Sequence, residues 1–215
     1  MQKMLKNKGI TVGRDRLFGI MRKEGLLVKR KRNYVRTTNS YHRFRVYKNL
    51  IKDLEITRSN EVYVADITYL KIREGYSYLS LITDKYSRKI VGYNLSNTLA
   101  VEGSLRALMM AARRLKGNRD IIHHSDRGLQ YCSNMYTGVL KRKGIKISMT
   151  QDNHVYENSL AERVNGILKN ELLLGSEYLS FDEAKSYVDE AVRIYNNERL
   201  HLSLNYKTPA EVHAD

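Results

Sequence analysis

The chain has 215 residues, 42% of them hydrophobic and 28% charged, with a formal net charge of +15 at pH 7. This composition is typical of a globular protein with one sizeable core and a small appendage. A membrane-spanning class is excluded, because no stretch is long and apolar enough to cross a bilayer. A single cysteine, Cys132, also excludes a disulfide framework and a multi-cysteine zinc site. With no apolar signal-peptide segment at the N-terminus, the expected location is the cytoplasm.

The positive charge is concentrated near the N-terminus. Residues 1–50 hold 15 of the 38 Lys and Arg residues but only 2 of the 23 Asp and Glu residues, so almost all the excess charge lies there. A local basic block favours binding to the phosphate backbone of a nucleic acid. A solubility-enhancing surface or a basic tail would have a similar composition, but this block also carries helical apolar patterning.

Two short helices are expected in this basic segment. Residues 1–8 are predicted to form the end of a helix that stops at Gly9, and residues 13–24 a second helix that stops at Gly25. The apolar stripe of the second helix contains Leu17, Phe18 and Met21. Two helices around a glycine-containing turn suggest a helix-turn-helix DNA-binding unit, although any helical hairpin has this pattern.

Residues 28–45 have little apolar periodicity and are predicted to be a basic linker. We therefore expect a basic helical DNA-binding segment with its linker over residues 1–50, followed by a core over residues 58–212. In the first segment, the residues expected to contact DNA are Arg14, Arg16, Lys29, Arg30, Lys31 and Arg32.

From residue 61 onward the pattern is that of an α/β domain. Residues 61–72 alternate and are rich in β-branched side chains, and two further strands follow a turn at Gly75. Later segments predict a helix at 101–116, a strand at 120–126, a helix at 133–143, a strand at 145–150, and helices at 159–173 and 181 to about 196. Three consecutive strands followed by this alternation predict a mixed sheet of about five strands with flanking helices.

Two of these helices have more specific signals. The last one is preceded by Ser180 with Glu183 three residues later, which predicts a capping box at its N-terminus. The helix over 101–116 is expected to present an apolar face made of Leu105, Leu108, Met109 and Ala112.

Three acidic residues of the core are candidates for a catalytic site. Asp66 lies in the middle of the first strand among apolar neighbours, where a lone carboxylate is costly unless it is paired, protonated or metal-bound. Asp126 ends the fourth strand, and Glu162 lies on the helix over 159–173, off its apolar face. Each has a plain alternative: a solvent-facing strand for Asp66, a turn for Asp126 and a solvated helix surface for Glu162.

Taken together, these carboxylates can converge on one point. Three oxygen ligands with room for water and phosphate suit Mg²⁺ or Mn²⁺. Two such ions can activate an attacking oxygen and stabilise a leaving one in phosphoryl transfer. Glu157 is the alternative third ligand, because it lies near Glu162 in the sequence, but its expected loop position favours Glu162.

Several long motifs occur in an order that points to a known family. They are DITYL at 66–70, HHSDRGLQYCS at 123–133 and ENSLAERVNGILKNE at 157–171, with 35 residues between Asp126 and Glu162. The matching pattern runs from RDRLFGIMRKEGLLVKR at 14–30 to YNNERLHLSLNYKTPAEVH at 195–213. Over nearly its whole length, the chain resembles transposases of bacterial insertion sequences in the retroviral-integrase superfamily. Within that superfamily it is similar to the branch with an Asp-Asp-Glu triad and a downstream Lys.

The resemblance implies a ribonuclease-H-like core that cleaves and joins DNA in transposition. Asp66, Asp126 and Glu162 match the triad, which implies catalytic and metal-binding roles with Mg²⁺ or Mn²⁺, as two ions. Lys169, seven residues after Glu162, shares its helix face, and Asn165 lies near the same face. The expected partners are DNA ends and target DNA, further copies of the chain, and the product of an upstream reading frame.

Some roles stay open at this stage. Arg127, like Lys169 and Asn165, is a candidate for contacting DNA, and His123 and His124 for supporting the site, although packing or turn roles fit them equally well. Gly128 is expected to let the chain turn sharply beside DNA, and Cys132 to be a small buried residue. Two rival functions are a catalytically idle DNA-binding regulator and a structure-selective nuclease on the same core.

Overall fold

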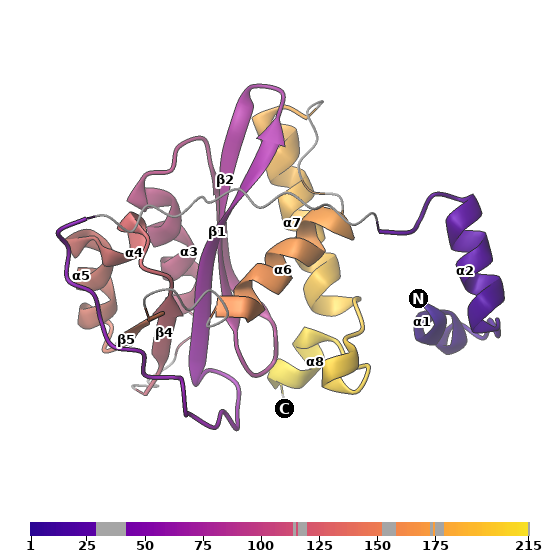
Figure 1. Cartoon of the computed structure of the whole chain (residues 1–215), viewed down its shortest axis with the longest axis horizontal. Coiled ribbons are helices and arrows are strands. Elements are labelled where there is room, and N and C mark those ends of the chain that lie inside the picture. The colour runs from indigo at the N-terminus through magenta and orange to yellow at the C-terminus, as the bar shows by residue number, and fades with distance from the viewer. Residues whose placement is uncertain are drawn as a thin grey trace.

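A computed structural model describes residues 1–28, 42–113, 115, 120–151, 158–172, 174 and 179–214. Its centre is a mixed five-stranded sheet with strand order β3-β2-β1-β4-β5 (Figure 1). The strands are β1 (Val62–Ile72), β2 (Gly75–Asp84), β3 (Ile90–Ser96), β4 (Ile122–Ser125) and β5 (Lys146–Met149). β1, β2 and β3 form an antiparallel meander, whereas β4 and β5 run parallel to β1. The predicted mixed sheet is confirmed.

Helices cover both faces of this sheet (Figure 1). On one face lie α3 (Val101–Arg113), α4 (Leu129–Cys132) and α5 (Asn134–Arg142); on the other lie α6 (Ser159–Asn170) and α7 (Phe181–Asn197), followed by η2 (Leu202–Leu204) and α8 (Pro209–Ala214). Side chains along β1 alternate between the two faces of the sheet. Leu70 packs toward α6 and α7, whereas Tyr63 packs toward α3 and α5. The capping box predicted at Ser180 and Glu183 is present at the start of α7.

The expected apolar face of α3 is confirmed in part. Leu108 and Ala112 are buried and Leu105 packs against the core, but Met109 is 40% exposed, and Ser104, Ala107 and Ala111 are also buried. The cause is a close approach to β3: a Cβ added to Gly92 would collide with the Ala107 carbonyl. Small residues line this contact, so the periodicity of large side chains alone does not reveal the whole buried face.

The basic N-terminal segment contains the two expected helices, α1 (Gln2–Asn7) and α2 (Arg14–Lys23). Gly9 and Gly25 follow them with φ of +79° and +67°, a conformation that favours glycine. Of the expected apolar stripe on α2, Leu17 is buried but Phe18 is 49% exposed. The predicted DNA contacts at Lys29, Arg30, Lys31 and Arg32 lie outside the described residues.

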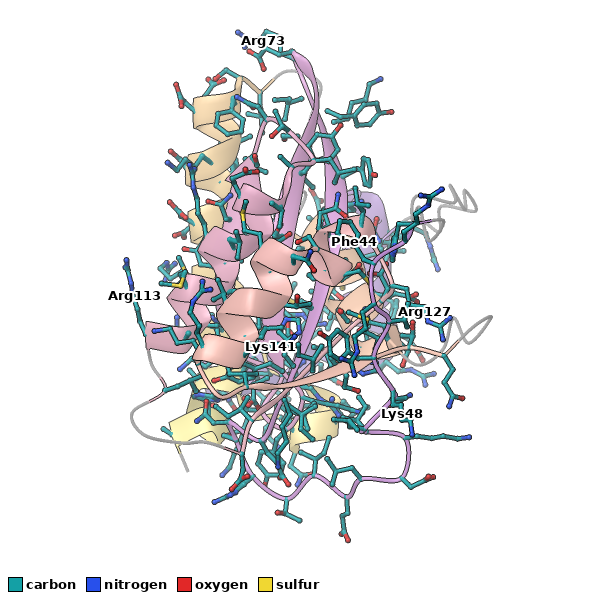
Figure 2. All side chains as sticks on the ribbon, turned by 90° about the vertical axis from the view of Figure 1, so that its left-hand side faces the viewer. Phe44, Lys48, Arg73, Arg113, Arg127 and Lys141 are labelled. Carbon is teal, nitrogen blue, oxygen red and sulfur yellow. The ribbon has the colours of Figure 1, made fainter. Side chains whose placement is uncertain are left out.

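Residues 42–51 form a strap along the β5 edge of the core (Figure 2, where Phe44 and Lys48 mark its course). The Leu50 amide donates a hydrogen bond to Ser148 Oγ at 2.8 Å, and Ile51 is buried against Val62 and Ile122. The boundary expected at residue 50 stays a prediction. No helix among the described residues is long and apolar enough to cross a membrane.

Candidate active site

The sheet places Asp66 and Asp126 side by side. β1 and β4 are parallel neighbours whose last paired residues are Ala65 and Ser125, so each aspartate is the next residue on its chain. Neighbouring strands lie about 4.8 Å apart, which makes the two carboxylates direct neighbours. β4 ends one residue before Asp126, at a rigid point of the sheet.

Asp66 is held by two hydrogen bonds. Its Oδ1 accepts from the Ile67 amide at 2.9 Å, and its Oδ2 accepts from Asn165 Nδ2 on α6 at 2.6 Å. Burial raises the pKa of Asp66 to about 8, with a further contribution from the charge of Asp126. The residue is therefore neither an ordinary solvated carboxylate nor one neutralised by a strong ion pair.

Asp126 is fixed by the loop that follows it. Its Oδ1 accepts from the Gly128 amide at 3.0 Å. A Cβ on Gly128 would also lie only 3.0 Å from that oxygen, whereas the φ of Gly128, −63°, is ordinary. The close approach to the Asp126 carboxylate, rather than the sharp turn expected from the sequence, is what favours glycine here.

Helix α6 brings Glu162 and Lys169 to the same place. Repulsion from Glu162 helps to raise the pKa of Asp66, and attraction to Lys169 lowers it, so both side chains lie close enough to act on that carboxylate. Glu162 is exposed, and partial burial raises its own pKa. Glu157, the alternative third ligand, lies outside the described residues.

Asn165 and Tyr131 both lie beside the aspartates, and Tyr131 was not among the candidates predicted from the sequence. Its side chain is only 7% exposed and donates to Asp66, and whether it also contacts DNA stays a prediction. Its Oδ1 is buried without a hydrogen-bond partner among the described residues, as is the hydroxyl of Tyr131. After burial and Tyr136, the charges of Asp66 and Asp126 raise the pKa of Tyr131 further, which places its ring near both carboxylates.

The donor set fits a hard divalent cation. Asp66 and Asp126 are neighbours, Glu162 and Lys169 lie close enough to act on the charge of Asp66, and unpartnered polar atoms of Asn165 and Tyr131 lie near the aspartates. In the arrangement seen here, the described residues contain no group of three His, Cys, Asp or Glu side chains already placed to hold a metal.

The remaining candidates have structural partners. Arg127 Nε donates to the Thr150 carbonyl at 2.8 Å, and its own carbonyl lies 2.9 Å from His42 Nε2. His123 is buried beside Tyr136, and burial lowers its pKa to about 3. These contacts support packing and anchoring roles, and DNA binding by Arg127 stays a prediction.

Two other buried side chains of this region also have partners in the core. His124 Nδ1 lies 2.8 Å from Ser148 Oγ, which joins β4 to β5. Cys132 packs against Met149, as expected of a small buried residue, and burial raises the pKa of its thiol to about 11.

Solved structures with similar architecture define the fold. The catalytic core domain of HTLV-2 integrase in complex with magnesium matches with a TM-score of 0.58 and 21% identity, over 73% of this chain and 97% of that one. A chain of the simian T-cell lymphotropic virus intasome matches with a TM-score of 0.63 and 20% identity, over 84% of this chain and 62% of that one. The core is thus ribonuclease-H-like, of the type found in integrases.

Sequence comparisons then identify the family. Models of the integrase core domain match residues 56–154 and 143–209. The chain is 39% identical to the 31 kDa protein of insertion element IS600 from Shigella sonnei, over 98% of this chain and 78% of the relative. It is 33% identical to transposase InsF of IS3A from Escherichia coli, over 84% of this chain and 64% of the relative. It is 30% identical to the IS904 transposase of Lactococcus lactis, over 97% of this chain and 83% of the relative. The chain belongs to the integrase-core family of insertion-sequence transposases.

Proposed function

We propose that the chain catalyses metal-dependent cleavage and joining of DNA ends in transposition of an insertion sequence. What supports this proposal is that Asp66 and Asp126 are neighbours on parallel strands, and that Asp126, Glu162 and Lys169 all act on the charge of Asp66. An Asp pair on adjacent parallel strands, with a Glu supplied by a helix, is a rigid set of oxygen donors. Such a set suits two-metal phosphoryl transfer.

Each residue of the site has a defined task in this proposal. Asp66, Asp126 and Glu162 would hold Mg²⁺ or Mn²⁺, as two ions, and the ions would supply activation of the attacking oxygen and stabilisation of the leaving oxygen. Asn165 orients the Asp66 carboxylate through its 2.6 Å hydrogen bond. Lys169 binds a DNA phosphate beside the carboxylates.

The reaction needs no covalent link between protein and DNA. Water first cleaves a phosphodiester at an element end and frees a 3′-hydroxyl. That hydroxyl then attacks a target phosphodiester, whose own 3′-oxygen leaves as the new P–O bond forms. The basic residues of the N-terminal segment, including Arg14 and Arg16, bind the DNA backbone. Further copies of the chain, and the product of an upstream reading frame, are the protein partners we expect on the element ends.

The decisive experiment removes the negative charge of each carboxylate while keeping the shape of the side chain. Asp66→Asn, Asp126→Asn and Glu162→Gln should each reduce Mg²⁺-dependent strand transfer by at least about 10³-fold, and the combined losses should not add, because the three act as one unit. DNA affinity should be largely unchanged. The products are resolved on denaturing gels with end-labelled element ends.

Glu157→Gln is the matched control and should stay active. Strong strand transfer by Glu162→Gln together with loss in Glu157→Gln would move the third ligand into the loop. Cleavage without a joined product in the unmodified chain would instead favour a nuclease. DNA binding with neither cleavage nor joining would favour an idle regulator.

A further inference from the structure

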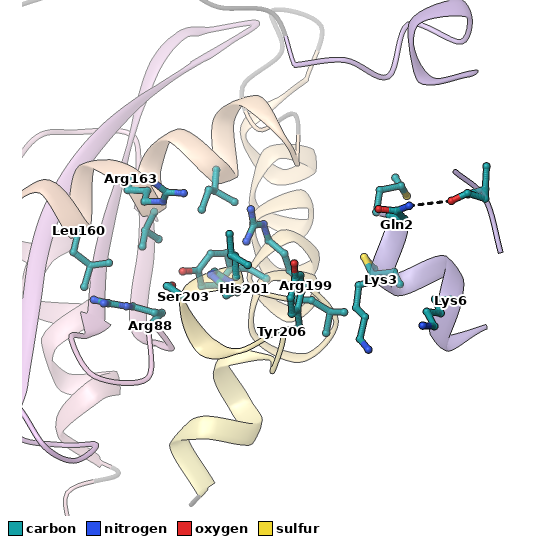
Figure 3. Close-up of a pocket in the computed structure, with 18 of the residues that line it drawn as sticks. Gln2, Lys3, Lys6, Arg88, Leu160, Arg163, Arg199, His201, Ser203 and Tyr206 are labelled. Carbon is teal, nitrogen blue, oxygen red and sulfur yellow. Dashed lines mark hydrogen bonds between the residues drawn. The ribbon is translucent and has the colours of Figure 1, made fainter. Parts of the chain in front are cut away.

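A second charged region lies beside α6. A cavity of about 1340 Å³ opens there between the core and α1 (Figure 3). The described residues that line it include no Asp or Glu and six Lys or Arg: Lys3, Lys6, Lys85, Arg88, Arg163 and Arg199. We call this region the cationic cavity. A lining of one sign attracts ligands of the opposite sign.

The cations that the core contributes are close to one another. Arg88 Nη1 donates to the Lys85 carbonyl at 2.7 Å, within the turn between β2 and β3. Burial lowers the pKa of Arg88, the charges of Tyr195 and Asp84 oppose that shift, and the charge of Arg163 on α6 adds a smaller lowering. Burial, and then the charge of Arg88, lower the pKa of Lys85. Among the described residues, none of these three is in an ion pair, whereas Arg199 is paired with Glu171 at 2.8 Å.

Two further features of the lining are independent of the charge. Arg88 has a φ of +67°, which side chains other than glycine seldom adopt and which tends to mark functional positions. His201 is 7% exposed, and its Nε2 is buried with no hydrogen-bond partner among the described residues. A buried ring nitrogen without a partner is costly unless a ligand supplies one.

We propose that the cationic cavity is a second DNA-binding site, in which Lys85, Arg88 and Arg163 bind consecutive phosphates of one strand. The inference rests on the proposed function, because it takes the strand to be the one that enters the carboxylate site. Glu162 and Arg163 are neighbours about 100° apart on α6, so a strand in the cavity passes directly beside the carboxylates. The volume exceeds the roughly 300–1,000 Å³ typical of small-molecule pockets, which favours a polymer over a single anion.

The test removes two charges from the cavity and two from elsewhere. The full-length double variant Arg88→Gln/Arg163→Gln is compared with Arg106→Gln/Arg113→Gln, which loses two exposed arginines of α3 on the other face of the sheet (Figure 2 labels Arg113). The Kd for duplex DNA is measured without divalent metal over a range of salt. Each phosphate contact contributes about −0.9 to the slope of log affinity against log salt, so the cavity variant should lose about 1.8 from the slope and the control nothing.

The outcomes separate this inference from the proposed function. A reduced slope in the cavity variant, in a chain that joins no strands, would support the DNA site while removing the proposed function. An unchanged slope in a chain that does join strands would overturn the DNA site alone. If the double variant fails to fold, Arg163→Gln is used by itself, because its side chain is exposed, with an expected loss of about 0.9.

A second arm distinguishes DNA from a free anion. Inorganic phosphate is titrated into the full chain by calorimetry at constant ionic strength. Phosphate binding that disappears in Arg88→Gln/Arg163→Gln, with an unchanged DNA slope, would assign the cavity to a small anion and overturn the proposal. Weak or no phosphate binding together with the reduced DNA slope is the expected result.

Discussion

The carboxylate site and the cationic cavity both use α6, but they hold charges of opposite sign. Glu162 acts on Asp66 from one side of the helix, and Arg163 lines the cavity with Arg88 from another. In each region burial is the main cause of the pKa shift, raising the pKa of Asp66 and lowering that of Arg88. A like charge nearby adds to each shift, although Tyr195 and Asp84 oppose that of Arg88. Both regions are therefore built for a ligand of the opposite sign.

The two regions differ in how the charges are positioned. Asp66 lies within the central strand and is fixed by hydrogen bonds at 2.6 and 2.9 Å. The cavity takes Lys85 and Arg88 from a turn and Arg199 from beyond the end of α7, all on long side chains. Metal coordination requires fixed ligand distances, whereas phosphate binding by Lys and Arg tolerates movement. The same helix thus serves one rigid site and one adaptable one, and the following variants test that contrast.

The largest effect is expected at the rigid site from Asn165→Ala. This change removes the donor to Asp66 Oδ2, and loss of such an outer-shell partner typically weakens metal binding by about 10–100-fold. Mn²⁺ binding to the full chain is measured by calorimetry. Asn170→Ala, at the exposed end of α6, is the control and should keep the affinity of the unmodified chain. Equal affinities in both variants would show that Asp66 does not depend on α6 for its orientation.

A smaller effect is expected from Lys169→Ala, which removes the proposed contact with a DNA phosphate beside the carboxylates. A hydrogen bond to a charged group contributes about 1.5–3 kcal/mol, so strand transfer should fall at least about tenfold. The free energy of unfolding should change by no more than about 0.5 kcal/mol, because the residue is half-buried and outside the apolar clusters. Unchanged strand transfer with unchanged melting would leave Lys169 as an ordinary solvated lysine.

These sites were not equally visible in the sequence. Asp66 and the strand ending before Asp126 could be predicted, because strand alternation and turn residues are local signals. The cationic cavity could not, since Arg88, Arg163 and Arg199 are far apart in the chain and meet only when the β2–β3 turn, α6 and the end of α7 pack together. The contact of α3 with Gly92 was missed for another reason, because small residues leave no periodic signal in the sequence.

A still smaller effect is expected from the N-terminal helices. Arg14→Gln/Arg16→Gln should reduce the salt slope of DNA binding by about 1.8 if each residue contacts one phosphate, while strand transfer at low salt stays close to that of the unmodified chain. Combined with the cavity variant, the two reductions should add, because the sites do not share residues. An unchanged slope would place the DNA contacts of this segment elsewhere.

The smallest effect is a pH dependence of stability in the metal-free chain, and its sign distinguishes the two regions. The pKa of Asp66 is raised from 3.8 to about 8, so the folded state binds more protons than the unfolded state between these values. Stability from this group is then lost as the pH rises. Burial lowers the pKa of His201, in the cavity, to about 4, which gives the opposite slope, but only below about pH 6.5.

Between pH 6.5 and 8, the contribution of Asp66 is therefore seen without that of His201. The loss over this range is at most about 2 kcal/mol, and less because Asp66 is only half-buried, so the melting temperature should fall by about 3 °C. Asp66→Asn should abolish the fall, and Asp189→Asn on the exposed side of α7 should preserve it. Mg²⁺ should raise the melting temperature more at pH 8 than at pH 6.5, because protons and metal compete for the same carboxylate. A fall of equal size in Asp66→Asn would show that the titration of Asp66 does not cause this pH dependence.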